Sequence, residues 1–79
     1  MKYRIELSIT SENGTIATSI REANYDKQKI DNYGWRLGQD IADAIIGVEC
    51  YLTHKDFSEL FEAINDRLQD YQATFKENT

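Results

Sequence analysis

The fold is decided by residues 53–75, which read THKDFSELFEAINDRLQDYQATF. Large apolar residues recur there at steps of three and four: Phe57, Leu60, Phe61, Ile64, Leu68, Tyr71 and Phe75. At 100° per residue they fall within about 100° of one another, which is the apolar stripe of an amphipathic helix. Thr53 precedes the stripe and can cap the free backbone N–H groups of a first turn. The pattern predicts a helix over about residues 54–76.

The opposite side of this predicted helix is acidic. Glu59, Glu62, Asp66 and Asp70 follow one another at steps of three and four, so their carboxylates form one line that points away from the apolar stripe. We call these four residues the acidic row. A row of this kind is usually no more than a solvated outer face, and the alternative interpretation is an electrostatic surface for a basic partner.

The N-terminal part of the chain predicts an antiparallel β-hairpin. Apolar and polar residues alternate over about residues 2–10 and again over 15–21, the period of a strand with one buried face. The Asn-Gly dipeptide at 13–14 favours a two-residue type I′ turn, in which both residues have positive φ. With this turn Leu7 faces Ile20, and the apolar residues of both strands share one face.

The period changes after the hairpin. Over about residues 26–46 a three-four spacing predicts a helix, carried by Ile30, Tyr33, Leu37, Ile41, Ala44 and Ile45. Gly34 and Gly38 lie inside it and cost roughly 1 kcal/mol each relative to Ala, a cost that close packing of a neighbouring element would explain. The alternative is a loop over residues 31–36, with the helix beginning near Leu37.

The residues after this helix leave a choice between two structures. Gly47 ends the helix. Residues 48–52 then alternate and fit either a short third strand or a plain connector, and the alternation favours the strand.

Together these elements predict a single α+β domain over residues 1–79, in the order β-β-α-β-α. It is a small two-layer domain in which two α-helices pack on one face of an antiparallel sheet. The predicted core places Leu60, Ile64 and Leu68 of the last helix against Leu7, Ile20 and Ile41. A chain of this length buries only about 60–65% of its unfolded surface, so we expect modest stability.

The charge balance narrows the classes of partner. The net charge is −5, from 9 basic and 14 acidic residues, with +1 over residues 1–39 and −6 over residues 40–79. Free nucleic acid and anionic membranes are therefore unexpected partners, because phosphate binding needs clustered Lys and Arg. One cysteine excludes an internal disulfide. The sequence shows no signal peptide and no transmembrane run, so we expect a cytoplasmic protein.

No pattern in the sequence indicates catalysis, a metal or a cofactor. Cys50 and His54 are four residues apart, but nothing nearby supplies the activated thiol that a nucleophile needs. We expect a buried structural Cys50 and a surface His54. Acid–base catalysis needs two carboxyl groups in unlike environments inside a cleft, and the acidic row points outward. No phosphate-binding, calcium-binding or nucleophile-elbow motif occurs. The protein is therefore expected not to be an enzyme.

Trp35 and Ile46 form a second candidate surface. They lie roughly 120–160° away from Ile30 on the predicted middle helix, off its main apolar stripe. They are either buried between the sheet and the last helix or exposed for a partner, and the sequence favours neither. Exposed tryptophan is common in binding hot spots. If both residues are exposed, a second copy related by a two-fold axis would cover them, which makes a homodimer.

These observations favour a small acidic protein-binding module whose candidate contact residues are the acidic row, Trp35 and Ile46. The expected partner is another protein with a basic surface, with no direct contact to nucleic acid or membrane. In size and charge the chain is similar to acidic inhibitors with which bacterial viruses occlude basic nucleic-acid channels, anti-CRISPR proteins among them. This similarity is an analogy, and no residue is carried over from it. The alternative is a homo-oligomeric structural or regulatory subunit with no charge-directed partner.

Overall fold

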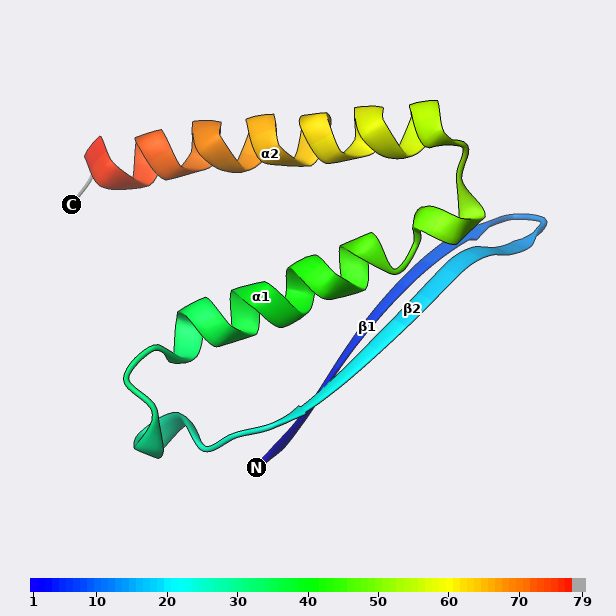
Figure 1. Ribbon diagram of the computed structural model, residues 1–79. Helices are drawn as coiled ribbons and strands as arrows, with labels where there is room; N and C mark the ends of the chain where they lie inside the picture. Colours follow the sequence, from blue (N-terminus) through cyan, green and yellow to red (C-terminus); the bar gives the residue numbers. More distant parts are fainter. Residues whose placement is uncertain (78–79) are drawn as a thin grey trace.

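The chain forms an antiparallel hairpin followed by two helices, as the computed structural model shows for residues 1–77 (Figure 1). In chain order the elements are β1 (Lys2–Ser11), β2 (Gly14–Asn24), the 3-10 turn η1 (Lys27–Lys29), α1 (Tyr33–Ile46), the 3-10 turn η2 (Glu49–Tyr51) and α2 (His54–Glu77). This arrangement confirms the predicted α+β class, with an N-terminal hairpin and two helices.

The predicted type I′ turn is wrong. Ser11 pairs with Gly14, so the two loop residues are Glu12 and Asn13. Among the described residues only Gly14 has a positive φ, of 124°. The hydroxyl of Ser11 explains this turn, because its Oγ accepts a hydrogen bond from the Asn13 N–H at 3.1 Å and donates one to the Gly14 carbonyl at 3.3 Å.

The predicted strand register is also wrong, by one residue. Leu7 faces Ser19 and Ile9 faces Ala17, and a register shift follows between Ile9 and Thr10. Because a one-residue slip exchanges the two faces of a strand, Ala17 and Ser19 are buried, whereas Ile20 is 44% exposed. The predicted burial of Ile20 is therefore wrong as well.

The middle helix begins later than the predicted residue 26. Residues 27–29 form η1, which Asp26 caps by accepting a hydrogen bond from the Gln28 N–H at 3.0 Å. Ile30 then has an extended backbone, with φ −123° and ψ 135°, and interrupts the helical pattern. Helix α1 starts at Tyr33, between the two starting points that the sequence offers.

Within residues 1–77 the sheet has two strands, and the third strand expected over residues 48–52 is replaced by η2. The Tyr51 N–H donates to the Val48 carbonyl at 3.0 Å and the Leu52 N–H donates to the Glu49 carbonyl at 3.1 Å. Val48 is completely buried. The alternation of apolar and polar residues over 48–52 is therefore too short to distinguish a strand from a helical turn that buries Val48.

Helix α1 is the helix that packs on the hairpin, and it contacts both strands. At the end of α1, Gly47 approaches Ser19 of β2 closely, and the small residues Ala17, Ser19 and Ala44 are buried. Helix α2 runs along α1 and is not packed closely against either strand (Figure 1). Helix α1 therefore supplies the close contacts between the helical layer and the strands.

Candidate functional site

The acidic row lies on α2, and the start of this helix is fixed as the sequence predicts. Thr53 Oγ1 accepts a hydrogen bond from the Asp56 N–H at 3.1 Å, which satisfies one free donor of the first turn. Asp56 also places a negative charge at the positive end of the helix dipole. The cap fixes the residue at which α2 begins, and the spacing of the four acidic residues places them on one side of the helix.

All four side chains of the acidic row are exposed. Three of them line a shallow surface depression together with small or neutral polar residues: Glu59, Glu62, Ala63, Asn65, Asp66 and Gln69. Asp70 lies one turn further along the helix. The ion pairs among the described residues join Arg4 to Glu6 and Glu22, and Arg21 to Asp43, so none of them involves the acidic row. Among the described residues, the acidic row is therefore exposed without an ion-paired cation.

The apolar stripe of α2 is covered only in part. Phe57, Leu60 and Ile64 are half-buried, whereas Phe61, Leu68, Tyr71 and Phe75 are each more than half exposed. Leu68 is 63% exposed, so its predicted burial against the sheet is wrong. The reason is the position of α2, which faces α1 and not the strands.

The two helices enclose an apolar groove of about 160 Å³. Its lining comes from both helices: Ala42, Ile45 and Ile46 of α1, and Phe61, Ile64, Asn65 and Leu68 of α2. Asn65 is the one polar residue of this lining. Ile46 is still 50% exposed, so the two candidate residues of the middle helix are not sandwiched between layers.

Trp35 lies near the other end of α1 and is 66% exposed. It borders a separate surface hollow with Tyr25, Arg36 and Asp40. The structure therefore places Ile46 beside the stripe of α2 and Trp35 three turns away along the same helix. It brings neither residue next to the acidic row, which lies on the opposite side of α2 from the stripe.

Sequence reasoning did not find the cluster of Tyr3, Tyr25 and Tyr33. Their ring centroids are 5.0, 5.7 and 5.8 Å apart, and the Tyr25 hydroxyl donates to Asp40 Oδ2 at 3.4 Å. The hydrogen bond with Tyr33, and then burial, raises the pKa of Tyr3 to about 12. Burial, and then the charge of Asp40, raises the pKa of Tyr25. Both hydroxyls are neutral at pH 7. The contact between the rings of Tyr3 and Tyr33 joins β1 to α1.

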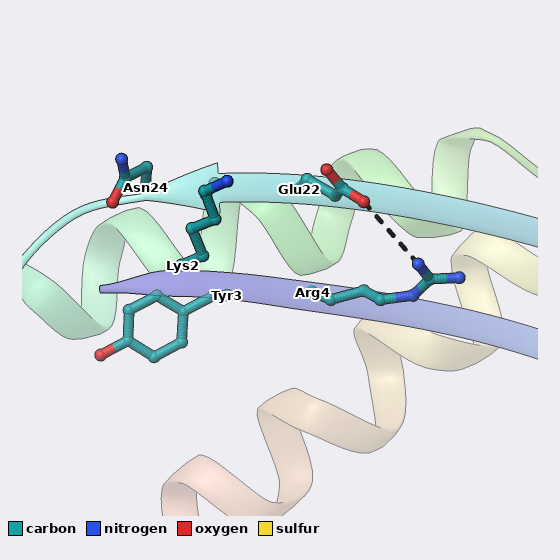
Figure 2. Close-up of a pocket in the computed structure, with 6 residues that line it drawn as sticks. Lys2, Tyr3, Arg4, Glu22 and Asn24 are labelled. Atoms are coloured by element: carbon teal, nitrogen blue, oxygen red, sulfur yellow. Dashed lines mark ion pairs between the residues drawn. The ribbon is translucent and has the colours of Figure 1, made fainter.

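A second surface missed by the sequence analysis lies at the open end of the hairpin (Figure 2). Lys2, Arg4, Glu22 and Asn24 border it, and Tyr3 projects away from them. The guanidinium of Arg4 lies 3.7 Å from Glu22 and 3.8 Å from Glu6, so its charge is already balanced by carboxylates. We therefore do not assign a ligand to this surface.

The Cys50 side chain is exposed, which corrects the expected buried thiol. Its Sγ lies 3.8 Å from the Gly47 carbonyl oxygen. His54 is exposed, as expected. In the part of the chain that the structure describes, no three His, Cys, Asp or Glu side chains are grouped so that they could hold a metal ion. No helix within it has the length and apolar character needed to cross a membrane.

No protein-family model matches this chain, and neither a curated protein nor a solved structure matches it. The candidate functional surfaces are the acidic row and the apolar stripe of α2, together with the exposed residues Trp35 and Ile46 of α1.

Proposed function

We propose that this protein is a small, non-enzymatic protein-binding module that docks its acidic row onto a basic surface of another protein. The observation that supports this proposal is the exposed and unpaired acidic row. Its four carboxylates extend over about 16 Å of the helix, roughly one for each turn. They lie on one side of α2, so a single surface of a partner can meet all of them.

A row of this kind acts mainly on encounter and orientation. The exposed carboxylates of the row attract a basic patch over about 8–10 Å at physiological ionic strength, and this attraction speeds association. They contribute less to the lifetime of the complex, because each exposed ion pair is worth only about 0–1 kcal/mol. We therefore expect the affinity for the partner to fall as salt is added, mostly through a slower on-rate.

The partner class that suits this spacing is a protein that binds nucleic acid. Such a protein presents Lys and Arg along a groove to meet successive phosphates, and carboxylates on successive turns can occupy the same groove. In this proposal the module inhibits its partner by occluding the groove, as anti-CRISPR proteins of the acidic kind do. It turns over no substrate and needs no cofactor.

The test compares two variants with the same change in charge. In the row variant, Glu59, Glu62 and Asp66 are replaced by Lys. In the control variant, three exposed acidic residues outside the row are replaced by Lys: Glu12, Asp31 and Glu49. Both variants leave the apolar stripe intact, and circular dichroism should first show that both retain the helical content of the parent chain.

The parent and both variants are used as baits in a lysate of the native host, at low and at moderate salt. We expect the parent and the control variant to retain one stoichiometric basic protein, which the row variant loses. Added duplex DNA or RNA should release this protein from the parent bait. Equal retention by the row variant, or retention that neither salt nor nucleic acid weakens, would show that the acidic row is only a solvated face.

A further inference from the structure

One copy of this chain exposes more surface than a compact protein of its mass. Its accessible surface is 6598 Å², whereas about 4,900 Å² is expected at 9.2 kDa. Its radius of gyration is 15.1 Å, against about 12 Å for a compact domain of this length. Among the described residues, Val48 is the one large side chain that is fully buried. About 1,700 Å² of surface is thus in excess of what a compact chain would expose.

Much of the exposed apolar surface lies on the helical layer. The large side chains that contribute it include Trp35, Ile41 and Ile46 of α1, and Phe61, Leu68 and Tyr71 of α2. Three of them, Ile46, Phe61 and Leu68, also line the groove between the helices. An exposed apolar face of this kind is typical of an interface between proteins.

Helix α1 also carries a row of small residues that one copy of the chain does not explain. Gly34, Gly38 and Ala42 are spaced four residues apart and lie on one side of the helix. A Cβ atom at Gly34 or at Gly38 would meet nothing within 4 Å. Gly38 lies in the helix interior, where glycine costs roughly 1 kcal/mol, and Gly34 lies in the first turn. Because no atom of the same copy lies near either position, neither glycine makes room for a neighbour in that copy. A helix that approaches closely from outside would explain both.

We propose that a second copy of this chain covers this face, and that the two copies form a dimer related by a two-fold axis. In this dimer α2 of each copy lies on the row Gly34, Gly38 and Ala42 of the other. The large side chains of α2 in one copy pack against the small residues of α1 in the other copy. Because each copy carries both parts, the contact is reciprocal, as a two-fold interface requires.

The size of the excess accessible surface favours a second copy of the chain over a transient partner. Obligate dimers bury about 2,000–5,000 Å² in total, and the excess of about 1,700 Å² on each chain falls within that range when both copies are counted. Covering this surface stabilises a chain with so small a core, and the partner present at every synthesis is the chain itself.

The distribution of charge agrees with this choice. Two copies of a chain with a net charge of −5 repel each other if their acidic surfaces meet. The acidic row lies on the far side of α2 from the groove, so dimerisation through the groove keeps the two rows apart. Within the groove lining there is no charged side chain that would attract a basic partner. The inference does not rest on the proposed function, because the two use opposite sides of α2.

The test uses two isoleucines of nearly equal exposure. Ile46 on the groove is 50% exposed, and Ile16 on the hairpin is 49% exposed. Sedimentation equilibrium of the parent chain should give twice the chain mass of 9.2 kDa. Ile46→Asp should raise the dimer dissociation constant by at least about 100-fold, whereas Ile16→Asp should change it by less than about threefold.

A second pair of measurements keeps the test decisive if Ile46→Asp unfolds. Gly38→Leu adds a side chain where one copy has open space, so it should leave a single copy folded and weaken the dimer by at least about 10-fold. A nitroxide on the exposed native Cys50 should give one inter-copy distance, which disappears on dilution with unlabelled chain. A parent chain that sediments as a monomer at all concentrations overturns the proposal. So does a dimer that Ile16→Asp weakens and that Ile46→Asp and Gly38→Leu leave unchanged.

Discussion

Replacing Gly47 by alanine tests how the end of α1 packs against β2 of the hairpin. Gly47 follows the last turn of α1, and a Cβ atom there would overlap Ser19 Oγ and lie 3.1 Å from Ser19 Cβ and 3.3 Å from the Ala44 carbonyl oxygen. The backbone at Gly47 is helical, with φ −62° and ψ −16°. Alanine fits this backbone without strain, so Gly47→Ala changes the packing and not the conformation.

Two opposing effects set the size of the change. Alanine restricts the unfolded chain and should stabilise the protein by about 0.4–1 kcal/mol. The added methyl group meets the side chain of Ser19, which is buried. Forcing a methyl group into a packed contact costs about 1–3 kcal/mol. The net expectation is a loss of about 1–2 kcal/mol, and each kcal/mol lowers the melting temperature of so small a domain by about 4–8 °C.

The assay is thermal unfolding followed by circular dichroism, at one protein concentration for all variants because association raises the melting temperature. Gly47→Ala is measured in the parent chain and again in Ser19→Ala, which removes the overlapping hydroxyl. The cost of Gly47→Ala should be smaller in the Ser19→Ala background, since the two residues are in contact. A Gly47→Ala protein that melts at or above the parent temperature in the unmodified background would refute this packing of α1 on β2.

Three further predictions concern the turn, the helix cap and the tyrosine cluster. Gly14→Ala should lower the free energy of unfolding by roughly 1 kcal/mol, because alanine disfavours a φ of 124°; an unchanged urea midpoint would contradict the turn. Thr53→Ala should lose about 0.5–2 kcal/mol and Thr53→Ser should recover most of it, since Thr53 Oγ1 accepts the Asp56 N–H; equal urea midpoints for the two variants would contradict the cap. The pKa of Tyr3 is raised to about 12, so its contribution to stability is complete below pH 10 and is lost as the pH rises through about 12. Tyr33→Phe removes the hydrogen bond that is the largest cause, so absorbance titration should then show one tyrosine ionising at lower pH than in the parent.

The sequence predicts the elements well where a short-range pattern determines them. The apolar stripe and the Thr53 cap together locate α2, and the alternation of the first residues locates the hairpin. The register of β1 and β2 could not be predicted from this alternation, because it depends on the hydroxyl group of Ser11. Ser11 moves the turn one residue toward the N-terminus, and Gly14 alone takes the positive φ. The preference of an Asn-Gly pair for a type I′ turn does not take these hydrogen bonds of Ser11 into account.

The pattern also cannot show what covers an apolar face. The spacing of Phe61, Leu68 and Tyr71 correctly places these residues on one side of α2, but their burial depends on which element lies opposite. Here that element is α1, and the two helices meet too loosely to bury the stripe. The same limit applies to Trp35 and Ile46, for which the helical angle alone allowed either burial or exposure.

The most direct test of the account is the accessibility of Trp35, the only tryptophan of the chain, as the protein is diluted. In one copy its side chain is 66% exposed, and in the proposed dimer the second copy covers it. Acrylamide should quench its fluorescence weakly at concentrations where the dimer forms and strongly after dilution, with circular dichroism unchanged between the two. The folded Ile46→Asp variant should show strong quenching at every concentration. Strong quenching of the parent chain at all concentrations would contradict the claim that a second copy covers the helical face.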